Sequence, residues 1–139
     1  MLVGLRKAWA RTEFREEPAC YGKPPDHLFD HERLEAYQRA IDFIRWFHGQ
    51  PGAAELSSRL LRQVDKAGTS VVLNIAEANG RYAAGDRRNL LDIAEASAVR
   101  AGAYLELCTR AGEIDSNQKH CGLDFLGRMA SMVRALSIS

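Results

Sequence analysis

The most constraining feature of this sequence is a pair of long segments whose apolar residues recur at helical spacing. The first runs from about Ala54 to Asn79, and the second from near Asp86 to about Gly112. Residues three and four apart share one side of an α-helix, so each segment predicts a long amphipathic helix. The two-residue alternation of a half-buried strand is not found along the chain. The fold is therefore expected to be all-α.

Shorter helical patterns precede and follow this pair. One begins after Asp30, a favourable N-cap residue, and ends at the breaker Gln50-Pro-Gly52. The other follows the turn Asp115-Ser-Asn117. Four amphipathic helices with short connections predict an antiparallel up-down four-helix bundle over residues 30–139. Residues 1–29, which contain three prolines, are expected to form a partly disordered N-terminal arm.

The helix expected over residues 86–112 has apolar residues on two sides. A monomeric bundle needs only one such side per helix, so the second stripe predicts a homo-oligomer. On the preceding helix, Leu73 lies opposite the centre of the apolar face. It is either an ordinary exposed apolar residue or part of a second contact surface. The candidate oligomer contacts are Leu73, Ala96, Val99, Ala103 and Leu107.

Length and composition narrow the class of protein. The chain has 139 residues, of which 46% are hydrophobic and 27% charged, as expected for one globular domain. The cysteine number is odd, and no Cys-x-x-Cys pair occurs, which fits a reduced environment. No apolar run approaches the ~18 residues of a membrane span, and no signal-peptide core is evident. We therefore expect a cytoplasmic protein without a membrane partner.

Local charge points to nucleic acid more than net charge does. The formal net charge is only +1. However, the segment from Arg59 to Arg88 has six basic residues and three acidic ones. Arginine binds phosphate well through its planar fork of donors, although a charged helix side is often only solvated surface. No aromatic residue interrupts the stripe, so base stacking has no support. The candidate RNA- or DNA-binding residues are Arg59, Arg62, Lys66, Arg81, Arg87 and Arg88.

A polar group interrupts the apolar pattern of the second predicted helix. Asn74 lies one turn after Ser70 and can hydrogen bond to it, while Glu77 lies four residues before Arg81 in the favourable order for an ion pair. Such a group either caps backbone groups and fixes helix register or contacts a ligand. We assign Ser70, Asn74 and Glu77 to a structural polar motif.

Motifs for metal binding and catalysis are weak. The spacing His27-x-x-x-His31 is compatible with zinc on a helix, but Asp30 serves better as an N-cap, and Pro24-Pro25 disfavour a helix. The sequence contains no Gly-rich phosphate loop, Gly-x-Ser-x-Gly or His-Glu-x-x-His motif. We expect no metal, no cofactor, no small-molecule substrate and no enzymatic activity.

Three segments carry a resemblance to a known family: Phe29–Tyr37, Ser70–Arg81 with its core Asn-Ile-Ala-Glu, and Asp86–Ser97. Over residues 29–137 the chain resembles the four-helix bundle family of 23S ribosomal RNA intervening-sequence proteins. That family is similar to the accessory protein of diversity-generating retroelements. The resemblance implies a homopentamer of antiparallel bundles with a suspected role in RNA or DNA binding. The chain departs from the family at Ala78 and Ala96, where glycine is usual, and at Arg100, where an acidic residue is usual.

Two hypotheses for function follow. The leading one is a non-enzymatic, homo-oligomeric four-helix bundle that binds RNA or DNA through the basic stripe and the connector after it. The alternative is a protein-interaction scaffold, in which a protein partner docks on the oligomeric ring.

Overall fold

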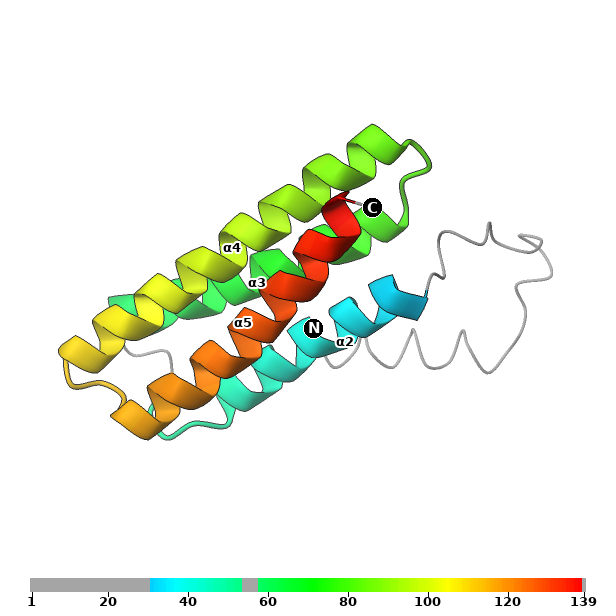
Figure 1. The fold of residues 1–139 in the computed structure, drawn as a ribbon. Helices are drawn as coiled ribbons and strands as arrows, with labels where there is room; N and C mark the ends of the chain where they lie inside the picture. Colours follow the sequence, from blue (N-terminus) through cyan, green and yellow to red (C-terminus); the bar gives the residue numbers. More distant parts are fainter. Residues whose placement is uncertain (1–30, 54–57, 139) are drawn as a thin grey trace, which may run out of the picture.

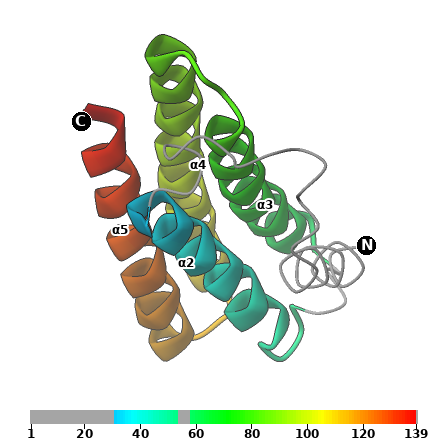
Figure 2. The ribbon, with the colours of Figure 1, turned by 90° about the vertical axis from the view of Figure 1, so that its right-hand side faces the viewer.

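The computed structural model describes residues 31–53 and 58–138, with side chains described from residue 34 onward, and these residues form four α-helices (Figure 1). The helices are α2 (His31–His48), α3 (Arg59–Asn79), α4 (Ala84–Arg110) and α5 (Ser116–Ile138). Consecutive helices run in opposite directions (Figure 1). Both α2 and α4 contact α3 and α5, so α2 and α4 occupy opposite sides of the bundle (Figure 2). The predicted four-helix bundle is confirmed for the described residues.

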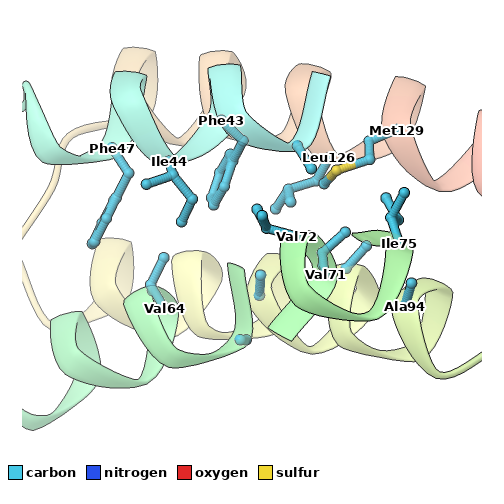
Figure 3. Packing of buried hydrophobic residues seen from close by; sticks show 14 of the residues in the cluster. Phe43, Ile44, Phe47, Val64, Val71, Val72, Ile75, Ala94, Leu126 and Met129 are labelled. Carbon is cyan, nitrogen blue, oxygen red and sulfur yellow. The ribbon is translucent and has the colours of Figure 1, made fainter. Parts of the chain in front are cut away.

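All four helices contribute side chains to one apolar core (Figure 3). On α2, the rings of Phe43 and Phe47 stack with their centroids 6.3 Å apart. Ile75 from α3, Leu105 from α4 and Met129 from α5 are also fully buried. Each such side chain stabilises the fold by about 1.5–3 kcal/mol relative to an exposed one. The helical apolar periods of the sequence therefore identify the faces that meet in the core.

Two buried glycines mark places where helices approach closely. A Cβ atom on Gly68 would lie 2.9 Å from Cδ1 of Ile44, at the contact between α3 and α2. A Cβ atom on Gly122 would lie 2.6 Å from Cδ1 of Leu105 and 2.8 Å from Cη2 of Trp46, where α5 meets α4 and α2. Only glycine fits these crossings without moving a neighbour.

The start of α3 differs from the prediction. Ser58 has an extended backbone, and its hydroxyl oxygen accepts a hydrogen bond of 3.0 Å from the Leu61 N–H. This is an N-cap, which satisfies one of the unpaired donors of the first turn. The helix therefore begins at Arg59, whereas the apolar pattern suggested about Ala54.

The start of α5 is set by a reciprocal pair. The Gln118 N–H donates to Oδ1 of Asp115 over 2.7 Å, and the Asp115 N–H donates to Oε1 of Gln118 over 2.8 Å. This is a capping box with Asp115 as the N-cap. Residues 116 and 117, predicted to form a turn, therefore belong to the helix.

The third predicted helix is displaced by about two residues at each end. It begins at Ala84 instead of near Asp86, so that Gly85 is helical, and it ends at Arg110. Gly112 follows with a φ of +77°, a left-handed conformation that favours glycine after a helix. The Glu113 N–H then donates to the Cys108 carbonyl oxygen over 2.9 Å, which satisfies a carbonyl of the last turn.

Some sequence predictions fall on other parts of the chain. The N-terminal arm over residues 1–29, together with His27 and Asp30, lies outside the described residues.

Within residues 31–53 and 58–138, no helix is both long and apolar enough to cross a membrane. The same residues contain no group of three or more histidine, cysteine, aspartate or glutamate side chains placed to hold a metal ion.

Candidate nucleic-acid interface

The first half of α3 carries an exposed row of three cations, Arg59, Arg62 and Lys66, which we call the α3 basic row. Their spacing of three and four residues places them on one side of the helix, over a length of about 10 Å. Neither Arg59 nor Lys66 forms a hydrogen bond or ion pair with another described residue. Two of the three cations of the row therefore have no counter-ion among the described residues.

The carboxylate within this segment is directed elsewhere. Asp65 lies next to Lys66 in the sequence, yet its Oδ1 is 2.5 Å from Nε2 of His48 on α2. Adjacent residues point about 100° apart around a helix. Asp65 therefore faces α2 and does not pair with the α3 basic row.

The connector arginines lie at the other end of α3 and make contacts of their own. Arg81 follows Lys66 by fifteen residues, or about 22 Å along a helix. Its Nη2 is 2.8 Å from Oε2 of Glu77, the ion pair that the spacing predicts. The structure therefore separates Arg81 from the basic row.

Arg87 and Arg88 bind carbonyl oxygens at the ends of other helices. Nη1 of Arg87 donates to the carbonyl oxygens of Arg81 and Tyr82, just after α3, over 3.2 and 2.5 Å. Nε of Arg88 donates to the Ser137 carbonyl oxygen near the end of α5 over 3.1 Å. Carbonyl groups at a helix C-terminus carry partial negative charge, which a guanidinium stabilises. These two arginines therefore have structural contacts, whereas Arg59 and Lys66 have none with another described residue.

The predicted polar motif joins α3 to α4. Nδ2 of Asn74 donates to the carbonyl oxygen of Ser70 over 2.8 Å and to its hydroxyl over 3.1 Å. The Ser70 hydroxyl also lies 2.8 Å from the hydroxyl of Ser97 on α4. These hydrogen bonds hold the two helices in one register. Ser97 is not among the site residues predicted from the sequence, and the signal that could have identified it is a hydroxyl group among the apolar residues of α4.

The candidate oligomer contacts are all exposed in the single chain. Leu73 on α3 is 54% exposed, and Val99 and Leu107 on α4 are 66% and 49% exposed. Ala96 and Ala103 are also exposed. α3 and α4 are neighbours in the bundle (Figures 1 and 2), so these exposed residues belong to one helix pair.

Two ionisable groups with shifted pKa values belong to the core. Burial raises the pKa of the Cys108 thiol from 9.0 to about 11, with a further contribution from the negative charge of Glu113 and a hydrogen bond to it. Burial also raises the pKa of the Tyr37 hydroxyl. Both groups are buried.

Comparison with known proteins adds to this geometry. Residues 32–135 match the model of the family described as 23S rRNA-intervening sequence protein. A crystal structure from Bacteroides thetaiotaomicron, of a protein with unknown function from the S23 ribosomal protein family, superposes with a TM-score of 0.60. It shares 21% sequence identity and covers 78% of this chain and 96% of its own, so the likeness concerns the fold. No curated protein matches the chain. Because the family model spans most of the sequence, the chain belongs to the 23S rRNA-intervening sequence protein family.

Proposed function

We propose that the protein is non-enzymatic and binds RNA or DNA through the phosphate backbone, with the α3 basic row as the contact surface. One observation supports this more than any other. Arg59 and Lys66 are exposed without a counter-ion among the described residues. By contrast, the exposed Arg128 and Arg134 on α5 are paired with carboxylates. Two cations without a counter-ion among the described residues, held on one side of a helix, favour a polyanion as their partner.

The chemistry of the row favours backbone recognition without base specificity. Guanidinium groups match the geometry of phosphate oxygens, and Lys66 adds a point charge. The row contains no aromatic side chain on which bases would stack. The family name refers to 23S rRNA, which supports RNA as the first polyanion to test. Binding is expected to depend on salt and to be similar for different base sequences.

Self-association is part of the proposal. The exposed side chains of Leu73, Val99 and Leu107 would be covered if copies of the chain met along the outer side of α3 and α4. The neighbouring alanines permit close approach of a second helix. The family resemblance implies five copies, and a pentamer would present five basic rows. Light scattering on a chain of 15.5 kDa should then give about five times that mass.

The experiment compares two triple variants of equal net charge. The row variant replaces Arg59, Arg62 and Lys66 by alanine. The binding of fluorescein-labelled RNA and DNA of about 20 nucleotides is measured by anisotropy at 50 mM salt, and circular dichroism checks the fold. We expect the row variant to bind at least tenfold more weakly, because up to three phosphate contacts per subunit are removed.

The control variant replaces Arg39, Arg128 and Arg134, each of which already has a carboxylate partner, by alanine. It changes the net charge by the same amount and is expected to bind like the wild type. An equal loss of binding affinity in both variants would show that binding depends only on the net charge of the protein. Absence of binding by the wild type at low salt would refute the proposed function.

The exposed apolar residues favour a second candidate, a scaffold on whose oligomeric ring a protein partner docks. Leu73 and Leu107 would then contact the partner. Purification from cells after nuclease treatment separates the two candidates. Recovery of one protein in stoichiometric amount, lost on Leu107→Asp substitution, would favour the scaffold. Co-purifying nucleic acid that depends on the basic row would favour the first candidate.

A further inference from the structure

The contact between His48 and Asp65 fixes which residues of α2 and α3 lie side by side. Nε2 of His48 is 2.5 Å from Oδ1 of Asp65. A second approach agrees with this register, because a Cβ atom on Gly68 would lie 2.9 Å from Cδ1 of Ile44. The two helices are antiparallel neighbours (Figures 1 and 2). Residues that precede His48 on α2 therefore lie at the level of residues that follow Asp65 on α3.

Arg45 on α2 and Lys66 on α3 lie at nearly the same level. Relative to the contact between the helices, Arg45 is three residues before His48 and Lys66 one residue after Asp65. This spacing displaces them by about 4.5 and 1.5 Å in the same direction. Both residues are exposed. Neither side chain forms a hydrogen bond or ion pair with another residue of 31–53 and 58–138, so Arg45 continues the α3 basic row onto α2.

Arg45 lies on the exposed side of α2 that is nearer to α3, as its neighbours on the helix show. His48, about 60° away around the helix, contacts α3. Trp46, about 100° away in the other direction, packs on Phe125 of α5 with the ring centroids 5.8 Å apart. Phe47, about 160° away, is buried in the core. The guanidinium group of Arg45 is therefore carried beside α3 and away from α5.

The described carboxylates near Arg45 on α2 and α3 have other partners. Asp42, one turn before Arg45, has its Oδ2 3.4 Å from Nη1 of Arg39. Oε2 of Glu35 is 4.0 Å from Nη2 of the same arginine. On α3, Asp65 is held by its contact with α2. These carboxylates therefore leave Arg45 without a counter-ion.

The acids of the flanking helices do not neutralise the site either. Glu113, just after α4, accepts a hydrogen bond of 2.7 Å from the hydroxyl of Ser58. Asp124 on α5 is paired with Arg128. Glu106 is exposed on α4 and forms no ion pair with a described residue. Because α2 and α4 occupy opposite sides of the bundle, Glu106 lies across α3 from the exposed side of α2 (Figure 2).

This surface is separate from the faces proposed for self-association. Most of the candidate oligomer contacts lie on α4, and none lies on α2. The contact on α3, Leu73, is seven residues or about 10.5 Å beyond Lys66 along the helix. A strand bound to the α3 basic row can therefore extend over α2 while a second copy of the chain covers α4.

We propose that Arg45 binds a phosphate of the strand held by the α3 basic row, so that the nucleic-acid backbone crosses from α3 to α2. This inference rests on the proposed function. Neighbouring helix axes are about 8–10 Å apart, so cations on both helices can bind phosphates of one strand. The strand then follows the row along α3 and passes over α2 at the level of Lys66.

The test uses Arg45→Ala in the full-length chain, with the labelled RNA as a single-stranded probe. One phosphate contact to a single strand contributes about 0.7 to the slope of log K against log salt. Because this contribution is close to zero at about 1 M salt, its loss weakens binding about fivefold at 100 mM salt. We expect both changes for Arg45→Ala, and neither for Arg45→Lys, which keeps the charge. Arg128→Ala is the matched control, because it removes an exposed arginine that is paired with Asp124.

Light scattering and thermal unfolding of Arg45→Ala separate phosphate binding from other roles. A wild-type mass together with the stated loss of affinity and slope would support the inference. Wild-type affinity and slope, while the row variant binds weakly, would show that the inference is wrong and leave the proposed function intact. A lower melting temperature with wild-type affinity would place the guanidinium group at the C-terminal carbonyls of α2 and also contradict the inference.

Two further results would overturn the inference. Loss of affinity only together with a fall in mass would assign Arg45 to assembly. If the wild type itself binds no RNA, the proposed function fails, and the contact inferred for Arg45 fails with it.

Discussion

Arg88 on α4 and Ser137 on α5 tie the beginning of one helix to the end of another. Nε of Arg88 donates to the Ser137 carbonyl oxygen over 3.1 Å, and the buried Ser137 hydroxyl donates to Asp92, one turn further along α4. A guanidinium at the carbonyl end of α5 also interacts favourably with the helix dipole. Arg88 therefore helps to hold α4 and α5 together.

Replacing Arg88 by alanine should lower stability without changing nucleic-acid binding. The lost hydrogen bond and dipole interaction correspond to about 1 kcal/mol of unfolding free energy. Urea denaturation followed by circular dichroism measures the change, and RNA anisotropy measures binding. Arg128→Ala, which removes an exposed ion pair, should change stability by less than about 0.5 kcal/mol. Weaker RNA binding by a folded Arg88→Ala protein would place Arg88 in the interface instead.

Gly122→Ala should destabilise the bundle, whereas Gly127→Ala on the same helix should not. The added methyl at Gly122 would meet Leu105 and Trp46 at less than 3 Å, so side chains must shift. We expect a loss of about 1–3 kcal/mol in urea denaturation. Gly127 is exposed with nothing within 4 Å, so alanine there should raise stability by about 0.5–1 kcal/mol through helix propensity. Equal stability of the two variants would contradict the close approach of α5 to α4 and α2.

The buried thiol of Cys108 predicts a loss of stability at alkaline pH. The pKa of this thiol is about 11 in the folded chain, against 9.0 for an ordinary cysteine, which we take for the unfolded chain. Below pH 9 the thiol is therefore protonated in both states, and its contribution to folding stability is fully present. Between these values the unfolded thiol ionises first, and stability falls as the pH rises. The fall amounts to on the order of 2 kcal/mol.

Urea denaturation of Cys108→Ala at pH 8, 9 and 10 measures this effect. The variant should lose less stability over that range than the wild type. Tyr37, whose pKa is also raised by burial, is present in both proteins and cancels in the comparison. Cys121→Ala, at an exposed position, is the control and should follow the wild type. Identical pH dependence of Cys108→Ala and wild type would mean that the thiol is not held protonated.

Ser97→Ala should weaken the link between α3 and α4. Its hydroxyl hydrogen bonds to Ser70, which also accepts from Asn74. We expect each single substitution, Ser70→Ala or Ser97→Ala, to reduce stability by about 1 kcal/mol. The double variant should lose less than the sum of the two, with a coupling of about 0.5–1 kcal/mol. Full additivity in thermal unfolding would argue against a shared hydrogen bond.

The sequence predicted the helices well and their ends poorly. Apolar period reflects burial, and burial of residues such as Phe47 and Val71 follows directly from that period. Ends depend on capping contacts of single side chains. Ser58 and the Asp115–Gln118 pair are residue types that commonly cap helices, and their side-chain hydrogen bonds set the starts of α3 and α5. Ala83 before α4 makes no side-chain cap, so the sequence held no local signal for that start.

The candidate site was predicted in part. Helical spacing placed Arg59, Arg62 and Lys66 on one side of α3, and all three are exposed. The sequence also placed Arg88 in the candidate site, although Arg88 donates a hydrogen bond to the carbonyl oxygen of Ser137, 49 residues further along the chain. Helical spacing within one segment does not reveal such a contact between distant helices.

The salt dependence of RNA binding tests the central claim most directly. The association constant is measured by anisotropy between 50 and 200 mM salt for the wild type and for the variant lacking Arg59, Arg62 and Lys66. For a single strand, three phosphate contacts predict a slope of log K against log salt of about −2.1 or steeper, which is about an 18-fold loss over this range. The variant should show a slope closer to zero by about 2.1. A wild-type slope near zero, or equal slopes for the two proteins, would contradict a phosphate-binding row on α3.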